Sequence, residues 1–300
     1  MTMMSSPENL GGVQAAPETA RLVDDAVAQA RAAATAAGVG VRALTDLADL
    51  EQVVGLFGQI WGRDANPPLS LELLRAFGKA GNYVSGAFAG DRLVGACVGF
   101  FHAPSEDSLH SHIAGVVPEM AGRAVGFALK LHQRAWTMRR GVDQVAWTFD
   151  PLMSRNAYFN VVKLAARPVE YMPNFYGLMV DTVNGDGDSD RLLVRWSLRD
   201  PAVAEACRRP EERRARLSLP ADAVVALGTA VDGSPVPGRL DGRTSLVAVP
   251  PDITALRASA PALAVRWRRA VRDTMTELMA QGATVVGFDR SGGYVLRREP

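Results

Sequence analysis

The sequence predicts an α/β protein with two lobes. Residues 39–200 are expected to form a mixed sheet flanked by helices, after a tail and helix over 1–38 and before a smaller α+β lobe over 201–300. Two observations predict this division. Short apolar runs alternate with helix-like segments through the first two thirds of the chain, which is the order of an α/β domain. A chain of 300 residues is also long for one compact core and comfortable for two.

The expected elements of the first lobe have local signals. The alanine-rich segment 17–37 favours a helix that stops near Gly38, while Thr45 and Gly62 suit the start and end of the next helix. Gly90-Asp91 between two apolar runs is typical of a β-hairpin. The expected strands are 39–44, the two hairpin arms within 83–101, 110–117, 142–150, 167–172 and 191–198; the expected helices are 17–37, 45–62, 70–81, 122–140 and 153–164.

The part after Pro201 begins with a charged, irregular stretch and then returns to apolar patterning. A long helix is expected to end at Gly282, and the last two strands should form a closing hairpin. The expected strands are 223–231, 245–250, 283–289 and 294–298, and the expected helix is 260–282.

Composition excludes several classes of partner and site. The 33 basic and 32 acidic residues nearly cancel, so no binding to nucleic acid or to a membrane surface is expected. Cys97 and Cys207 lie far apart without metal-ligand spacing, so we expect reduced thiols and no metal. No signal peptide and no apolar run of about 18 residues is evident, which favours a cytoplasmic protein.

The junction between the strand 110–117 and the helix 122–140 carries the strongest functional signal. A helix start presents several unpaired N–H groups and about half a positive charge, which together suit phosphate oxygens. Gly122 and Gly126 remove side chains that would block a close approach, and Arg123 can add a charge-assisted contact. The alternative is a plain strand-to-helix turn whose glycines ease packing. The apolar residues of this helix lie on one stripe, so its other side should face solvent.

The residues of this junction resemble a known family. "VVPEMAGRAVGFAL", Val116 to Leu129, is similar to the acyl-CoA-binding motif of GNAT-type N-acyltransferases, in which V-x-P ends a strand and a Q/R-x-x-G-x-G/A loop leads into a helix. Here Glu119 stands at the Q/R position. "SRNAYFNVVKLAA" resembles the family's N-x-x-A-x-x-x-Y-x-K-L-G-F signature, with Ala157 and Lys163 matching. The stretches "LHSHIAGVVPE", "TFDPLMSRNAYFN" and "PNFYG" resemble an uncharacterised bacterial branch of that superfamily more closely still. The C-terminal part, including "PALAVRWRRAVRD", also resembles that branch.

The resemblance implies a strongly twisted mixed sheet with a V-shaped opening between the strands 110–117 and 142–149. Acetyl-CoA or another short acyl-CoA would lie in that opening as co-substrate, with its diphosphate on the amides of 122–127. Asn156 and Asn160 would bond its pantetheine amides, although both also suit a plain polar helix face. The implied coenzyme contacts are Val116, Val117, Gly122, Arg123, Ala124, Val125, Gly126, Phe127, Asn156 and Asn160.

Three residues are candidates for the chemistry. Counting four residues back from Val116, where many family members carry a glutamate, lands on His112, whose ordinary pKa of about 6.5 suits a base. His110 is expected on the same face, two residues earlier. The family's usual tyrosine acid is replaced by Val161, so Tyr158, one turn earlier, is the substitute. Structural histidines, a packed aromatic ring and an unassisted thiolate remain the alternatives.

Four aromatic residues are candidates for contact with substrate. Trp147 and Phe149 lie on one face of the strand 142–150, where core packing is the alternative. Tyr171 and Tyr176 are placed on a loop that would border the acceptor pocket.

The resulting hypothesis is an acyl-CoA-dependent N-acyltransferase that acylates a primary amine of a small metabolite such as an amino acid. A homodimer is left open. The alternative is a non-catalytic acyl-CoA-binding sensor or regulatory module, which Val161 favours. Thioester turnover with a panel of amines separates the two.

Overall fold

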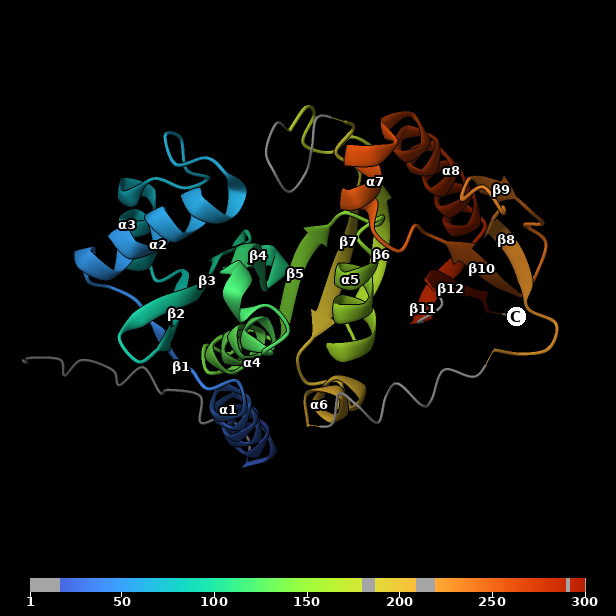
Figure 1. Cartoon of the computed structure of the whole chain (residues 1–300). Helices are drawn as coiled ribbons and strands as arrows, with labels where there is room; N and C mark the ends of the chain where they lie inside the picture. Colours follow the sequence, from blue (N-terminus) through green and yellow to red (C-terminus); the bar gives the residue numbers. More distant parts are fainter. Residues whose placement is uncertain (1–16, 180–186, 209–218, 290–291, 300) are drawn as a thin grey trace, which may run out of the picture.

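The computed structural model describes residues 17–179, 187–208, 219–289 and 292–299. Its strands form two sheets, one of seven strands in the first part of the chain and one of five strands in the last part (Figure 1). The predicted α/β class with an additional C-terminal α+β lobe is confirmed. None of the helices in the described ranges combines the length and apolarity needed to cross a membrane.

The larger sheet has the strand order β1-β2-β3-β4-β5-β7-β6. Every neighbouring pair is antiparallel except β4 and β5, which run parallel, so the sheet is mixed as predicted. Its strands are β1 (Gly40–Ala43), β2 (Tyr83–Ala89), β3 (Arg92–Phe101), β4 (Ser108–Val116), β5 (Gln144–Phe149), β6 (Arg167–Met172) and β7 (Arg191–Ser197).

Helices cover both faces of this sheet (Figure 1). A Cβ added at Gly115 would touch Trp61 of α2, while the side chain of the next residue, Val116, lies beside Gly126 of α4. Successive strand residues point to opposite faces, so α2 and α4 lie on opposite sides of β4. The helices of this part are α1 (Pro17–Ala36), α2 (Leu47–Trp61), α3 (Leu71–Lys79), α4 (Val125–Met138), α5 (Ser154–Ala157) and α6 (Pro201–Arg208).

The helix α4 is more buried than its sequence suggests. The expectation that its second side faces solvent is wrong, because α1 packs along that side. The guanidinium of Arg134 is buried there and donates to the carbonyl of Leu198 and to Gln29 of α1. One apolar stripe is therefore a poor guide to burial when a distant helix covers the polar side.

The predicted helix over 153–164 is divided in two. A short α-helix, α5, passes into a π-helical turn over Tyr158–Lys163, which ends with Ala165 in the left-handed region at φ 55°. The wider π turn places Asn160 and Val161 in the interior. Single π turns are common at functional sites, and this one borders the cavities described below.

The C-terminal lobe packs one long helix, α8, on a five-stranded sheet of order β11-β12-β10-β8-β9. Trp267, Val271, Met275 and Leu278 line the buried side of α8 at helical spacing. A preceding short helix, α7 (Ile253–Ser259), was not predicted; Asp252 caps it and it ends before Pro261. The remaining elements are β8 (Val224–Thr229), β9 (Pro235–Pro237), β10 (Thr244–Ala248), α8 (Pro261–Ala280), β11 (Ala283–Asp289) and β12 (Gly293–Arg298).

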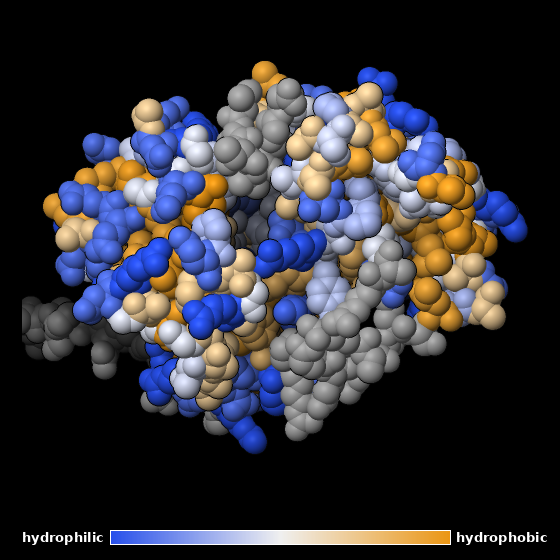
Figure 2. Space-filling model, in the orientation of Figure 1, coloured by the Kyte–Doolittle hydropathy of each residue, from blue (hydrophilic) through white to orange (hydrophobic). Residues whose placement is uncertain are grey.

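The two lobes are in contact. Strand β11 lies against β6 and the π-helical turn, and the hydroxyl of Tyr294 in β12 donates to the carbonyl of Pro151 at 2.7 Å. On the face shown in Figure 2, hydrophilic and hydrophobic residues are interspersed over both lobes. The C-terminal lobe therefore adjoins the segment that follows β5.

Candidate active site

An opening in the larger sheet separates β4 from β5. The two strands pair only through Ser108, Leu109 and His110, opposite Gln144, Val145 and Ala146. Beyond these pairs, β4 continues to pair with β3 as far as Val116, and β5 with β7 as far as Phe149. Each strand therefore keeps one edge directed at the opening without a ladder partner, and such edges can accept an added extended chain.

A β-bulge in β4 lies just past the last pair. Ser111 is opposite Gly99 of β3 and Ile113 is opposite Val98, which leaves His112 as the extra residue between them. A bulge bends its strand and redirects the side chain it carries. His112, the extra residue of this bulge, therefore lies at the start of the opening.

Two adjoining cavities occupy the opening. The first, here called the inner cavity, has a volume of about 240 Å³ and lies between the strands and α4. Its lining beyond the strands comes from α4 and from the α5 and π-helical segment. The inner cavity is lined by Ser111, His112, Ala114, Gly115, Val116, Gly126, Leu129, Lys130, Trp147, Thr148, Phe149, Asn156, Phe159 and Asn160.

The second, here called the outer cavity, has a volume of about 360 Å³. Its other walls come from α2 and the segment after it, from the segments that follow β5 and β6, and from the first residue of β7. The residues that line both cavities are His112, Ala114, Thr148, Phe149 and Asn156. The remaining outer lining is Trp61, Arg63, Pro68, Ile113, Asp150, Met153, Tyr176, Met179 and Arg191.

His112 lies where the two cavities meet. Burial lowers the pKa of its imidazole below the ordinary value, so the ring is neutral near pH 7 and able to accept a proton. Its ring centroid is 5.7 Å from that of Phe100 and 6.1 Å from that of His110. The arrangement suits a general base between two bound molecules.

His110, the other predicted histidine, lines neither cavity. Its ring packs on Phe100 with the centroids 5.0 Å apart. Burial, and then the charges of His112, His102 and Lys130, lower the pKa of His110 to about 4. His110 lies beside His112, with both rings packed on Phe100, but of the two only His112 borders the cavities, so a role of His110 in the chemistry stays a prediction.

The first turn of α4 offers free main-chain donors beside the inner cavity. A helix cannot supply carbonyl partners for its first N–H groups, here those of Val125, Gly126 and Phe127. The N-cap residue Ala124 has no side chain that could accept from them, and the turn carries no acidic residue. Gly122 and Ala124 both adopt left-handed conformations, at φ 81° and 61°, and such loops turn successive N–H groups toward one point.

Two of the predicted coenzyme contacts do not present their amides to this site. The N–H of Val117 donates to the carbonyl of Val94 at 3.0 Å, and the N–H of Arg123 donates to the carbonyl of Met120 at 3.3 Å. The Arg123 guanidinium contacts the Met120 sulfur at 3.4 Å. The set of available amides is therefore smaller than the predicted run 122–127.

The predicted residues of β5 and the following helix line the cavities, each in a different way. The indole N–H of Trp147 donates to Asn160 at 3.3 Å, so this buried asparagine holds the tryptophan ring. Asn156 is exposed and borders both cavities, as Phe149 does. Asn156 is therefore the better placed of the two asparagines to meet a ligand.

The tyrosines divide into one near the site and two away from it. Tyr176 lines the outer cavity, where its hydroxyl lies 3.3 Å from the Thr148 hydroxyl of β5. Tyr171 lies within β6 rather than on a loop, is buried, and donates to Asp190 at 2.7 Å; its placement at a pocket was wrong. Tyr158 packs against the core and lines neither cavity, and Val161 is buried.

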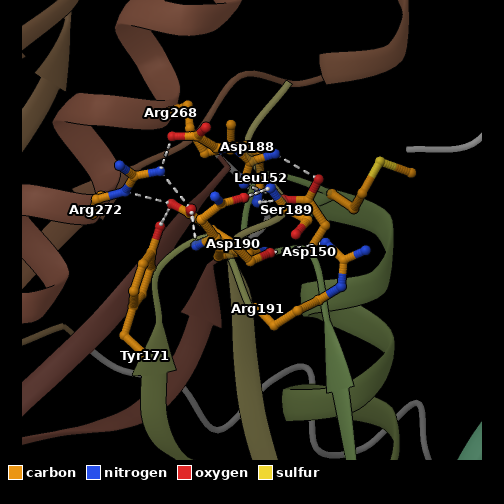
Figure 3. Close-up of polar contacts among 12 residues, drawn as sticks. Asp150, Leu152, Tyr171, Asp188, Ser189, Asp190, Arg191, Arg268 and Arg272 are labelled. Carbon is orange, nitrogen blue, oxygen red and sulfur yellow. Dashed lines mark hydrogen bonds and ion pairs between the residues drawn. The ribbon is translucent and has the colours of Figure 1, made fainter. Parts of the chain in front are cut away.

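A network of ion pairs joins the outer cavity to the C-terminal lobe (Figure 3). Arg268 donates to both oxygens of Asp150, at 2.6 and 2.7 Å, and Arg257 donates to one of them at 2.7 Å. Burial would raise the pKa of Asp150, but the hydrogen bonds from Arg268 and the charges of both arginines lower it to about 2. Asp150 follows β5 directly, so α7 and α8 hold one wall of the outer cavity.

A second set of ion pairs lies one helical turn along α8. Arg272 donates to Asp190 at 2.6 and 3.0 Å and to Asp188 at 2.6 Å. Asp190 precedes β7 and also accepts from Tyr171, as Figure 3 shows. Arg268 and Arg272 are four residues apart and therefore lie on one face of α8. Through them, α8 forms ion pairs with the residue after β5 and with the residue before β7.

Sequence reasoning missed several residues of the site. Thr148, Arg63 and Asp150 carry no motif, and their role follows only from the way distant segments meet. Lys130 was also missed, although it is one of only three lysines and stands in an otherwise apolar part of α4. Within the described parts of the chain, no group of three or more His, Cys, Asp or Glu residues is arranged to hold a metal.

Among known proteins, this chain is similar to solved structures of acetyltransferases. No protein-family model and no curated protein matches the sequence. An N-acetyltransferase from Staphylococcus aureus Mu50 is 12% identical, with a TM-score of 0.45 over 54% of this chain and 99% of that chain. The ribosomal-protein-S18-alanine N-acetyltransferase from Escherichia coli is 15% identical, with a TM-score of 0.43 over 53% and 94%.

A GNAT-family acetyltransferase from Streptococcus pneumoniae is 11% identical, with a TM-score of 0.44 over 52% of this chain and 97% of that chain. These solved structures are of the class that the sequence resemblance names. Each of these similarities covers just over half of this chain.

Proposed function

We propose that this protein is an acyl-CoA-dependent N-acyltransferase that transfers a short acyl group to a primary amine of a small metabolite such as an amino acid. The observation that carries the proposal is the meeting of two cavities at His112, within an opening between parallel strands. One cavity lies beside free helix amides that suit the coenzyme diphosphate, and the other is open to an acceptor.

Each cavity fits one partner of the reaction. The edge of β4 beyond His110 can bond an extended pantetheine chain as an added strand would, with Asn156 on the opposite side. Arg63 and Arg191 in the wall of the outer cavity favour an acceptor that carries a carboxylate. An amino acid has both the amine and that carboxylate.

The transfer itself needs few protein groups. The amine nitrogen attacks the thioester carbon, the C–N bond forms, and the C–S bond breaks with the coenzyme leaving as thiolate. Neutral His112 takes a proton from the amine, directly or through one water molecule. Holding donor and acceptor in adjoining cavities supplies proximity, which accounts for much of the rate in reactions of this kind.

Glutamate in place of Gly126 tests the diphosphate site separately from folding. A Cβ at this position has only the Val116 side chain near it, at 3.9 Å, so the fold accommodates the change. An acid in the first helical turn, and the loss of a helical glycine, should leave the free energy of unfolding equal or higher by about 1 kcal/mol. Affinity for coenzyme A, measured by calorimetry, should fall about tenfold or more, because the carboxylate repels the diphosphate.

The matched control for Gly126→Glu is Gly126→Gln, which has the same length without the charge. A smaller loss of coenzyme affinity in Gly126→Gln than in Gly126→Glu is expected. If the wild type and Gly126→Glu bind coenzyme A with equal affinity, the diphosphate does not bind at the start of α4.

The pH dependence of turnover should reflect His112. Because burial lowers its pKa, the neutral, proton-accepting form persists below the ordinary imidazole pKa of about 6.5. We expect kcat/KM, expressed per unprotonated amine, to be constant near neutral pH and to fall only as the pH drops through the lowered pKa. A limb centred at or above pH 6.5 in this profile would contradict the assignment.

A non-catalytic acyl-CoA-binding module is the second candidate, and Val161 is the observation that favours it. The resemblance places a tyrosine acid there, while in this chain the position is a buried valine and Tyr158 does not line the cavities. Turnover of acyl-CoA with a panel of amines decides between the two. If the protein binds acyl-CoA but releases free coenzyme A with none of the amines, the module is supported.

A further inference from the structure

Lys130 is a buried cation in the wall of the inner cavity. The side chain belongs to α4, and the residue is only 5% exposed. Its ammonium donates to the Ser111 hydroxyl and to the Gln133 side-chain oxygen, each at 2.9 Å. The ammonium also lies 3.7 Å from the centre of the Trp147 ring. All of these partners are electrically neutral.

No carboxylate in the described part of the chain forms an ion pair with Lys130. A buried ammonium without an opposite charge is costly, and proteins normally pair such a group. Burial lowers the pKa of Lys130 to about 8, which leaves the side chain mostly protonated at pH 7. The nearby Cys97 does not supply the missing charge, because burial raises the pKa of its thiol.

Lys130 stands at the closed end of the opening. Ser111 and Trp147, which touch its ammonium, are the first residues of β4 and β5 beyond the last strand pair. The other end of the inner cavity is marked by Gly126 and Val116, at the start of α4. A donor with its diphosphate at Gly126 and its thioester near His112 therefore directs its acyl group toward Lys130.

We propose that the inner cavity selects a coenzyme A thioester whose short acyl group ends in a carboxylate, and that Lys130 pairs with that carboxylate. The inference rests on the proposed function and adds the class of acyl donor to it. The acyl carboxylate supplies the negative charge that the buried ammonium lacks, and the Ser111 hydroxyl donates a second hydrogen bond to it. An acetyl group would leave this end of the cavity polar and unfilled.

The test compares thioesters on the full-length protein by calorimetry. Succinyl-CoA, which has the terminal carboxylate, is measured against butyryl-CoA, which has the same number of acyl carbons without it. Charge-assisted hydrogen bonds in a buried site predict that succinyl-CoA binds roughly 10- to 100-fold more tightly. Equal affinity of the wild type for the two thioesters overturns the proposal without any variant.

Lys130→Met removes the charge while keeping an unbranched side chain of similar length. Replacing a buried charge with an apolar group is often neutral for stability, so the variant is expected to fold. Its affinity for succinyl-CoA should fall roughly 10- to 100-fold, while its affinity for butyryl-CoA stays the same or rises. Lys79→Met, at the exposed end of α3, is the matched control and should keep the wild-type preference.

The outcomes separate this inference from the proposed function. If wild-type and Lys130→Met proteins bind both thioesters alike, Lys130 is a structural cation held by Ser111, Gln133 and Trp147, and the inference fails while coenzyme binding stands. If neither thioester nor coenzyme A binds the wild type, the proposed function fails together with the inference.

Discussion

Replacing His112 with alanine is expected to lower the rate of acyl transfer by about 100-fold or more, the usual contribution of a positioned general base. The affinity for coenzyme A should change little, because the diphosphate site lies at the start of α4. His112 borders both cavities, and its lowered pKa keeps it neutral near pH 7. The measurement is steady-state turnover with the amine that the panel selects, beside calorimetry of coenzyme binding.

His110→Ala is the matched control for this experiment. His110 lies on the same strand, its ring centroid is 6.1 Å from that of His112, and it borders neither cavity. Turnover within a few-fold of the wild type is expected from this variant. If His112→Ala keeps full turnover while His110→Ala loses it, the assignment of the base is reversed.

The second large effect concerns the contact between the lobes. Arg268→Met should reduce the free energy of unfolding by about 3 kcal/mol, because it removes the two charge-assisted hydrogen bonds that Arg268 donates to the buried Asp150 carboxylate. Urea denaturation followed by tryptophan fluorescence measures this loss. Since Asp150 borders the outer cavity, the KM for the amine should rise as well.

Arg269→Met, at the adjacent exposed position of α8, is the control and should change stability by less than about 0.5 kcal/mol. The double variant Asp150→Asn with Arg268→Met completes a thermodynamic cycle. In the Asp150→Asn background, Arg268→Met should reduce the free energy of unfolding much less than it does in the wild type. Additive losses in this cycle would show that the two side chains act independently and that the lobes are held together elsewhere.

The strand-to-helix junction could be predicted because its signals are local. Pro118 after an apolar run, the glycines 122 and 126 and the apolar stripe of the next helix lie within about two dozen residues. These neighbours predict a strand that ends near Val117 and a helix that follows it, and the structure has both elements, with α4 beginning at Val125 rather than at 122. The amide donors of Val125, Gly126 and Phe127 follow from the helix start itself.

The errors share a different cause. The histidine pair was judged from strict alternation along a strand, which does not reveal the bulge at His112 or that His112, and not His110, borders the cavities. Tyr171 was expected to border the acceptor pocket although it falls in the predicted strand 167–172; it is buried in β6 and donates to Asp190, which also accepts from Arg272. Both outcomes depend on how distant segments pair and pack, which the spacing of residues within one segment does not encode.

By itself the sequence determined the order of strands and helices up to β7, the glycine-containing loop that leaves helix amides free, and the presence of a histidine four residues before Val116. Only the tertiary structure decided that β4 and β5 separate after three pairs, that His112 rather than His110 borders the cavities, and that Lys130 is buried against the sheet beside them. The physical reason is the distance along the chain over which each interaction acts. Capping, turns and periodicity act between near neighbours, whereas a cavity and the burial of a charge depend on segments that meet only when the whole chain has packed.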